Sequence, residues 1–288
     1  MNTKHASAKV SVILLASYAL ATPTFAGKAC TSNSTESLHL RVNSASAAPD
    51  DDGYCFQTPQ EMNIKLYELG LCTSASSPVN KASCRPLFYS QTGKDVNLSV
   101  GSVNDLIDEA SIVEGQYTHG YIVISNRTSI KTVIEFDDVR EDDGGGRGVF
   151  CFTDGRSVND TPEPDSIMSC GGDAADAQPS EEVIGFLDDN DDYSNSELQY
   201  TIVMQGQTIV SDLYMISSDG TLSTSFEDDF AIYGSQRLQA PITITSNLAT
   251  EPTLDLGFSI TDGVMIGFGG TRPDDAVFEG LKFNVSLN

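Results

Sequence analysis

The stretch Val113–Asn126, VEGQYTHGYIVISN, constrains the fold of this chain more than any other. It opens with a glycine-containing turn signal and continues as a run rich in β-branched and aromatic residues, which favours a strand. Successive residues of a strand point to opposite faces, so Tyr121 and Val123 share one face while Ile122 and Ile124 share the other. Apolar residues on both faces predict the central strand of a β-sandwich.

A period of two recurs through much of the chain, in segments of strand length, and this pattern is typical of an all-β protein built from antiparallel β-sandwiches. Near Leu66–Tyr67 the alternation slips by one residue, which predicts a β-bulge. The dipeptide Asp262-Gly263 predicts a hairpin that pairs residues 254–260 with residues 264–268. A short helical turn is expected at 104–112. The expected strands are 37–43, 62–71, 87–89, 96–100, 117–124, 131–136, 149–153, 198–204, 208–217, 241–246, 254–260, 264–268 and 283–287.

The composition changes at residues 157–182, where prolines, glycines and aspartates replace apolar residues. Such a stretch is typical of a linker or of a long surface loop. We therefore expect two sandwich domains in tandem, an N-terminal domain at 27–156 and a C-terminal domain at 183–288, separated by this acidic segment.

Residues 1–26 have the layout of a secretory signal peptide. Lys4 and Lys9 precede the apolar run Val10–Ala21, and Thr24 and Ala26 provide the small residues that a signal peptidase reads. The apolar run is too short to cross about 30 Å of hydrocarbon, and no later run approaches that length. The expected location is secreted: the extracellular space, the cell surface or the periplasm.

All six cysteines follow the signal peptide, and an even count in an exported chain predicts disulfides. Six cysteines allow 15 connectivities, so the pairing does not follow from the sequence. We take pairing between sequence neighbours as the working hypothesis. The expected bridges are Cys30–Cys55, Cys72–Cys84 and Cys151–Cys170.

The chain is strongly acidic, with 41 Asp and Glu against 16 Lys and Arg and a formal net charge of −25. A surface of this sign repels nucleic acid and anionic lipid headgroups, so neither is an expected partner. It favours solubility, and it leaves many carboxylates free for divalent cations.

Two acidic clusters have the oxygen-rich composition that Ca²⁺ prefers, and Ca²⁺ is the cofactor candidate that the sequence offers. Asp188, Asn190 and Asp192 are spaced like the start of a calcium loop, although Tyr193 stands where an EF-hand needs glycine. The second cluster consists of Asp137, Asp138, Glu141, Asp142 and Asp143. The alternative for both clusters is solvated, solubilising charge. Asp228-Asp229 and Asp274-Asp275 are expected to be solvated loop charges.

No catalytic residues are predicted. The chain lacks a GxSxG elbow, an HExxH motif and a P-loop, and beyond the signal peptide it has two histidines, His39 and His119. His119 lies between Tyr117 and Tyr121 on one face of the expected central strand, which we interpret as an exposed strand position. Paired carboxylates for glycoside hydrolysis remain an alternative, although the absence of tryptophan disfavours a sugar-stacking cleft.

The order of a short apolar strand, a turn and the residues EGQY-T over Val113–Ile124 resembles prealbumin-like (transthyretin-like) sandwich modules of bacterial surface proteins. The resemblance implies a β-sandwich, and it transfers no ligand or activity.

The expected function is that of a non-enzymatic structural or adhesive protein at the cell surface or in the extracellular space, as a subunit of an assembly. The alternative is a monomeric extracellular module that binds calcium or a glycan. The expected partner is the protein itself, or other surface components, through strand addition. Ser37–Asn43 and Leu281–Asn288 are the candidate donor strands, and the alternative is that both strands complete their own sandwiches.

Overall fold

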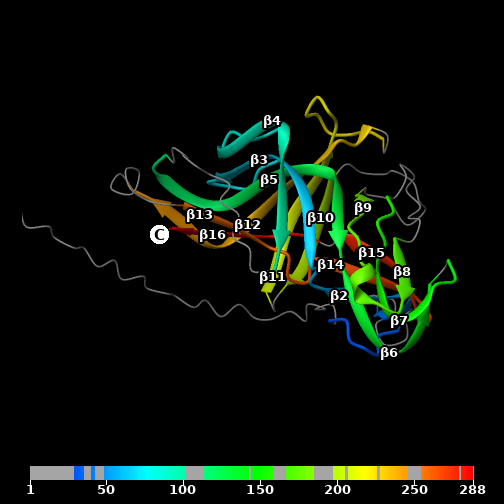
Figure 1. The fold of residues 1–288 in the computed structure, drawn as a ribbon. Helices are drawn as coiled ribbons and strands as arrows, with labels where there is room; N and C mark the ends of the chain where they lie inside the picture. Colours follow the sequence, from blue (N-terminus) through cyan, green and yellow to red (C-terminus); the bar gives the residue numbers. More distant parts are fainter. Residues whose placement is uncertain are drawn as a thin grey trace, which may run out of the picture.

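The computed structural model describes residues 29–35, 40–42, 49–100, 113–142, 144–157, 167–184, 197–204, 207–225, 228–245, 254–278 and 280–287 (Figure 1). The expected signal peptide and the expected helical turn at 104–112 lie outside these residues. Within the described residues the regular structure is β-strand apart from one 3-10 turn, η1 (Ala174–Asp176). The prediction of an all-β, antiparallel protein is therefore confirmed.

The largest sheet has the strand order β10-β11-β12-β5-β3-β4, and β9 also pairs with β5. β5 is hydrogen-bonded along both of its sides, to β3 on one side and to β12 and then β9 on the other. This position confirms that the stretch after Val113 forms a central strand. The strands of this sheet are β3 (Glu61–Cys72), β4 (Cys84–Ser99), β5 (Gly115–Lys131), β9 (Ser180–Val183), β10 (Glu197–Met204), β11 (Gln207–Ile216) and β12 (Ala231–Ile244).

Three smaller sheets complete the described fold. β1 (Leu40–Val42), β2 (Pro49–Gln57), β14 (Val264–Gly269) and β15 (Arg272–Phe278) form one sheet. β6 (Val133–Glu141), β7 (Arg147–Thr153) and β8 (Met168–Gly171) form the second, and β13 (Leu254–Ser259) with β16 (Lys282–Leu287) forms the third. β15 contacts both β6 and β8, so the first two of these sheets lie together at one end of the molecule (Figure 1).

The principal core lies between one face of the large sheet and the smaller sheets, which is the arrangement of a β-sandwich. Ile122 and Ile124 of β5 face this core, whereas Tyr121 and Val123 lie in a separate cluster on the other face. The central strand is thus apolar on both sides, as its sequence predicts. The core includes Cys55, Met62, Ile64, Leu66, Leu69, Val96, Leu98, Ile130, Ile134, Phe136, Met168, Met215, Ile232, Ile266 and Phe268.

The predicted β-bulge at Leu66–Tyr67 is confirmed. The register of β3 shifts between Leu66 and Glu68 against both of its neighbours, β4 and β5. Opposite this point β4 is longer than its partner, because Leu66 pairs with Lys94 while Glu68 pairs with Tyr89. The two short strands expected at 87–89 and 96–100 therefore belong to a single strand with a local protrusion at residues 90–93.

Strand pairing crosses the segment expected to separate two domains. β5 from the first half pairs with β12 from the second, and β2 pairs with β14. β9, at residues 180–183, overlaps the end of the expected linker and pairs with β5. The sheets therefore do not divide at residues 157–182, because the long-range partners of β2 and β5 lie beyond it.

The hairpin prediction at Asp262-Gly263 is wrong. A turn is present, with Asp262 at a φ of 57° and the Gly263 N–H donating to the Ile260 carbonyl at 2.9 Å. However, β13 pairs with β16, and β14 pairs with β2 and β15. The turn thus sends the chain from one sheet into another, a choice that local sequence does not encode.

We expect the shared core to unfold in one cooperative step. Ile232 on β12 is 4% exposed and packs against residues of both halves, so Ile232→Ala should lower the free energy of unfolding by about 2–5 kcal/mol. Val139→Ala, at a position 59% exposed, is the matched control and should change it by less than about 0.5 kcal/mol. Scanning calorimetry should give a single transition that moves as a whole; two transitions, of which one moves, would contradict the shared core.

Candidate functional site

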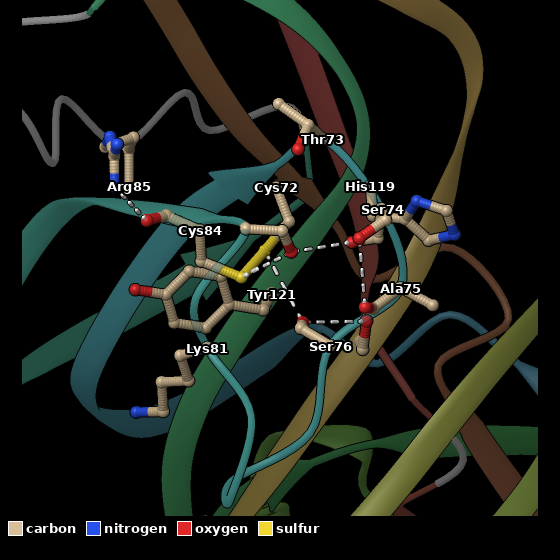
Figure 2. Close-up of a disulfide and its surroundings, with 12 residues drawn as sticks. Cys72, Thr73, Ser74, Ala75, Ser76, Lys81, Cys84, Arg85, His119 and Tyr121 are labelled. Atoms are coloured by element: carbon tan, nitrogen blue, oxygen red, sulfur yellow. Dashed lines mark hydrogen bonds between the residues drawn. A yellow bond between two sulfur atoms is a disulfide. The ribbon is translucent and has the colours of Figure 1, made fainter.

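The segment between Cys72 and Cys84 forms a loop that lies against the outer face of the large sheet (Figure 2). The two cysteines are paired residues of β3 and β4, and their disulfide closes residues 73–83. Ser76 of the loop is 6% exposed, and its Oγ lies 2.7 Å from the Tyr233 hydroxyl and 3.3 Å from the Ser235 Oγ. The loop is therefore fastened to β12 as well as to its own ends.

Beneath the loop lies a cluster of tyrosines from three neighbouring strands. The rings of Tyr121 on β5 and Tyr233 on β12 are stacked with centroids 5.6 Å apart, and Tyr214 on β11 meets Tyr233 edge-on at 6.0 Å. The Tyr121 ring crosses over β3 at Gly70, where a Cβ atom would lie 2.4 Å from the ring. A glycine is required there, because any side chain would displace the ring.

An ion pair borders this tyrosine cluster. The Lys81 Nζ lies 2.6 Å from Glu68 Oε2, and the Tyr121 hydroxyl donates to Glu68 Oε1 at 2.7 Å. The same ammonium lies 5.6 Å from the Tyr121 ring centroid and 5.3 Å from that of Tyr233, within the range of a cation–π contact. Lys81 thus ties the loop to both the carboxylate and the rings.

Burial sets the protonation of the two phenols. It is the largest cause that raises the pKa of Tyr121 well above the usual value, and the bond to Glu68 and the charge of that carboxylate add to it. Burial raises the pKa of Tyr233 to about 12, partly offset by the hydrogen bond with Ser76. Both phenols stay protonated at neutral pH, so they act as hydrogen-bonding groups and apolar surface rather than as phenolate nucleophiles.

The second acidic cluster is divided by the fold. Asp142 is 5% exposed, and its carboxylate accepts the N–H of Gly146 at 2.8 Å and the N–H of Cys170 at 2.6 Å. These bonds shape the glycine-rich turn and fix it to β8. Asp137 and Asp138 are exposed on β6, and Asp143 lies outside the described residues.

The other predicted metal ligands, Asp188, Asn190 and Asp192, also lie outside the described residues. Within the described ranges, no group of three or more His, Cys, Asp or Glu side chains is placed to hold a metal ion. The calcium hypothesis for both clusters remains a prediction.

All three disulfides connect sequence neighbours, so the expected pairing is confirmed: Cys30–Cys55, Cys72–Cys84 and Cys151–Cys170. The last of these joins paired residues of β7 and β8. Three disulfides indicate an oxidising compartment.

His119 is half-buried on β5, with its Nδ1 2.9 Å from the Thr118 Oγ1. Burial lowers its pKa, and the positive charge of Arg237 lowers it further. Tyr117 packs in a separate small cluster with Leu71 and Ile244. Tyr117, His119 and Tyr121 therefore do not form one polar group.

The prediction that Asp275 is a solvated loop charge is wrong, because Asp275 lies on β15 and is half-buried. Burial raises the pKa of its carboxyl to about 6, the Ala276 N–H at 2.7 Å opposes that shift, and the charge of Asp274 adds to it. Asp274 itself pairs with Arg272 at 2.8 Å.

The sequence analysis missed the pairing of Glu68 with Lys81. Lys81 lies in a loop whose position depends on the disulfide, and Glu68 directly follows the bulge that resets the register of β3. The alternation around Tyr121 was the available signal, because a large polar aromatic residue in a central strand needs a partner for its hydroxyl.

Comparison with known proteins gives no similarity on which to base a function. No family model, no curated protein and no solved structure matches the chain. In the part of the chain that the structure describes, no helix is long and apolar enough to cross a membrane.

Removing the Ser76 hydroxyl should loosen the loop. Ser76→Ala leaves the Tyr233 hydroxyl without its 2.7 Å partner in a buried site, which should cost about 1–3 kcal/mol of unfolding free energy. Ser74→Ala, in the same loop at an exposed position, should cost less than about 0.5 kcal/mol. Urea unfolding followed by tyrosine fluorescence measures both; equal effects would contradict a fastening role for Ser76.

Asp275 should make stability depend on pH. Its folded pKa of about 6 exceeds the unfolded value of 3.8, so the folded state holds a proton that the unfolded state loses, and stability should fall as pH rises from about 4 to 6. Asp275→Asn should remove this dependence and stabilise the protein at pH 7 by up to about 3 kcal/mol. Asp95→Asn, at an exposed carboxylate, is the control. Urea midpoints that change equally for both variants would contradict the assignment.

Proposed function

We propose that this protein is an exported, non-enzymatic structural or adhesive protein of the cell surface or extracellular space, acting as a subunit of an assembly. Its described strands pair in antiparallel sheets, in which main-chain hydrogen bonds join each strand to its neighbours. Such a body suits a load-bearing or adhesive role, in which a rigid surface rather than a moving active site is needed.

The observation that carries the proposal is the distribution of the disulfides. Cys55 lies on β2, Cys72 and Cys84 join β3 to β4, and Cys151 and Cys170 join β7 to β8. Two of the three larger sheets therefore contain a disulfide between neighbouring strands, and in the third Cys55 ties β2 to Cys30, which precedes the first strand. Each disulfide closes a loop with a sequence separation of 12 to 25 residues, and in the chain-entropy picture each stabilises the folded state by about 3 kcal/mol. This pattern supports a protein that must keep its shape outside the cell.

The polar side chains of the described fold support the same proposal. Glu68 and Lys81 fasten a loop, and Asp142 accepts two main-chain N–H groups. The Asp154 carboxylate accepts hydrogen bonds from the Arg156 Nε and from the Ser169 hydroxyl, each at 2.6 Å. These carboxylates are engaged in holding loops and strand ends together, which is the use expected in a structural protein.

Fractionation of the native host tests the proposal. We expect the mature protein, with all six cysteines oxidised, in the medium or on the protease-accessible surface of intact cells, and in particles heavier than one chain by light scattering. Material kept in the cell interior with free thiols would contradict it. A protein that is monomeric at every concentration, and more thermostable with calcium than with magnesium at equal ionic strength, would favour the calcium-binding alternative.

A further inference from the structure

We propose that the outer edge of β10 pairs with the β10 of a second copy of this chain, in an antiparallel arrangement that extends the large sheet across both molecules. This inference rests on the proposed function, because it names the surface and the partner through which the subunit assembles. It follows from how differently the sheet edges of this protein are built.

Most described sheet edges carry features that oppose pairing with another chain. β4, at one end of the large sheet, contains Pro86 and Lys94 and bulges at residues 90–93. β15 contains Pro273 and three charged residues, and five of the nine residues of β6 are charged. β1 and β8 have three and four residues. Each of these five edges is short, charged, interrupted by proline or irregular. The edges of the two-stranded sheet, β13 and β16, are regular but have six residues, compared with eight in β10.

β10, at the opposite end of the large sheet, carries none of these features apart from one charge. It reads ELQYTIVM, and Glu197 at its start is the charged residue. All eight residues pair with β11 without a register shift, from Glu197 with Tyr214 to Met204 with Gln207. Within the described strands β11 is its one neighbour. A regular, β-branched and nearly uncharged edge is a template for a further strand.

The sequence of β10 favours a second copy in the antiparallel direction. Residues that face each other in an antiparallel pair lie on the same side of the sheet, so a twofold axis places even-numbered residues opposite even-numbered ones. With Thr201 on the axis, Leu198 lies opposite Met204 and Tyr200 opposite Ile202. The register thus sets apolar residues opposite apolar residues at two pairs of positions on either side of the axis.

The charge of Glu197 also favours antiparallel over parallel pairing of the two β10 strands. In the antiparallel pair the two Glu197 residues lie roughly 25 Å apart, beyond the screening length of about 8 Å at physiological ionic strength. In a parallel pair they would be neighbours about 5 Å apart. The twofold arrangement also closes on itself, so it gives a dimer rather than an open fibre.

The net charge of −25 predicts how this pairing responds to salt. Two copies repel one another at low ionic strength, and added salt screens that repulsion without weakening main-chain hydrogen bonds between neutral groups. Dimerisation should therefore strengthen as sodium chloride rises.

The test compares two lysine substitutions on paired residues of adjacent strands. Thr201→Lys places two ammonium groups together on the twofold axis, whereas Val210→Lys makes the same change of charge on β11, directly opposite Thr201 and one strand away from the edge. Val210 is 45% exposed, so a lysine fits there. Sedimentation velocity of the mature protein should show dimerisation weakened roughly tenfold or more by Thr201→Lys and changed less than twofold by Val210→Lys.

Each outcome decides the inference. If Thr201→Lys does not fold by circular dichroism, Gln199→Lys on the same edge replaces it. Equal dimerisation of the Thr201 and Val210 variants overturns β10 pairing while leaving the proposed function intact. Loss of dimers in Val285→Lys alone would assign assembly to β16 instead. A wild-type chain that is monomeric at high salt overturns β10 pairing, and the surface location measured separately then decides the proposed function.

Discussion

The whole described fold depends on the two-sided hydrogen bonding of β5. Its N-terminal part pairs with β12, its C-terminal part pairs with β9, and β3 follows its other side. Because side chains alternate along it, one strand supplies Ile124 to the principal core and Tyr121 to the outer cluster. The sandwich on one side and the fastened loop on the other are thus two consequences of one strand.

The outer cluster shows how a polar group is accommodated in such a strand. Burying the Tyr121 hydroxyl is tolerated because the Glu68 carboxylate accepts its hydrogen bond, and Lys81 balances the charge of Glu68. Lys81 reaches this position because a disulfide folds its loop back on the sheet. Covalent, ionic and aromatic contacts therefore meet at one place on the outer face of the sheet.

Local features of this fold could be predicted from the sequence, but long-range pairing could not. The alternation in β5, the slip at Leu66–Tyr67 and the neighbouring cysteines each reflect interactions within a short stretch, and the structure confirms all three. The partner of β13 depends on which apolar faces meet in the core, so the turn at Asp262 gave the wrong partner. Likewise Asp142, one of the predicted calcium ligands, accepts main-chain N–H groups that come together once β7 and β8 pair.

The pairing of β5 with β12 also has a consequence for the order in which the chain can fold. β5 ends at Lys131 and β12 begins at Ala231. During synthesis, which starts at the N-terminus, β3, β4 and β5 can pair early. One side of β5 then stays unpaired until β12 has been synthesised. Until β12 is synthesised, the incomplete sheet exposes unpaired main-chain groups beside apolar residues such as Ile122 and Ile124. A chaperone that binds this edge of β5 would suppress misassembly.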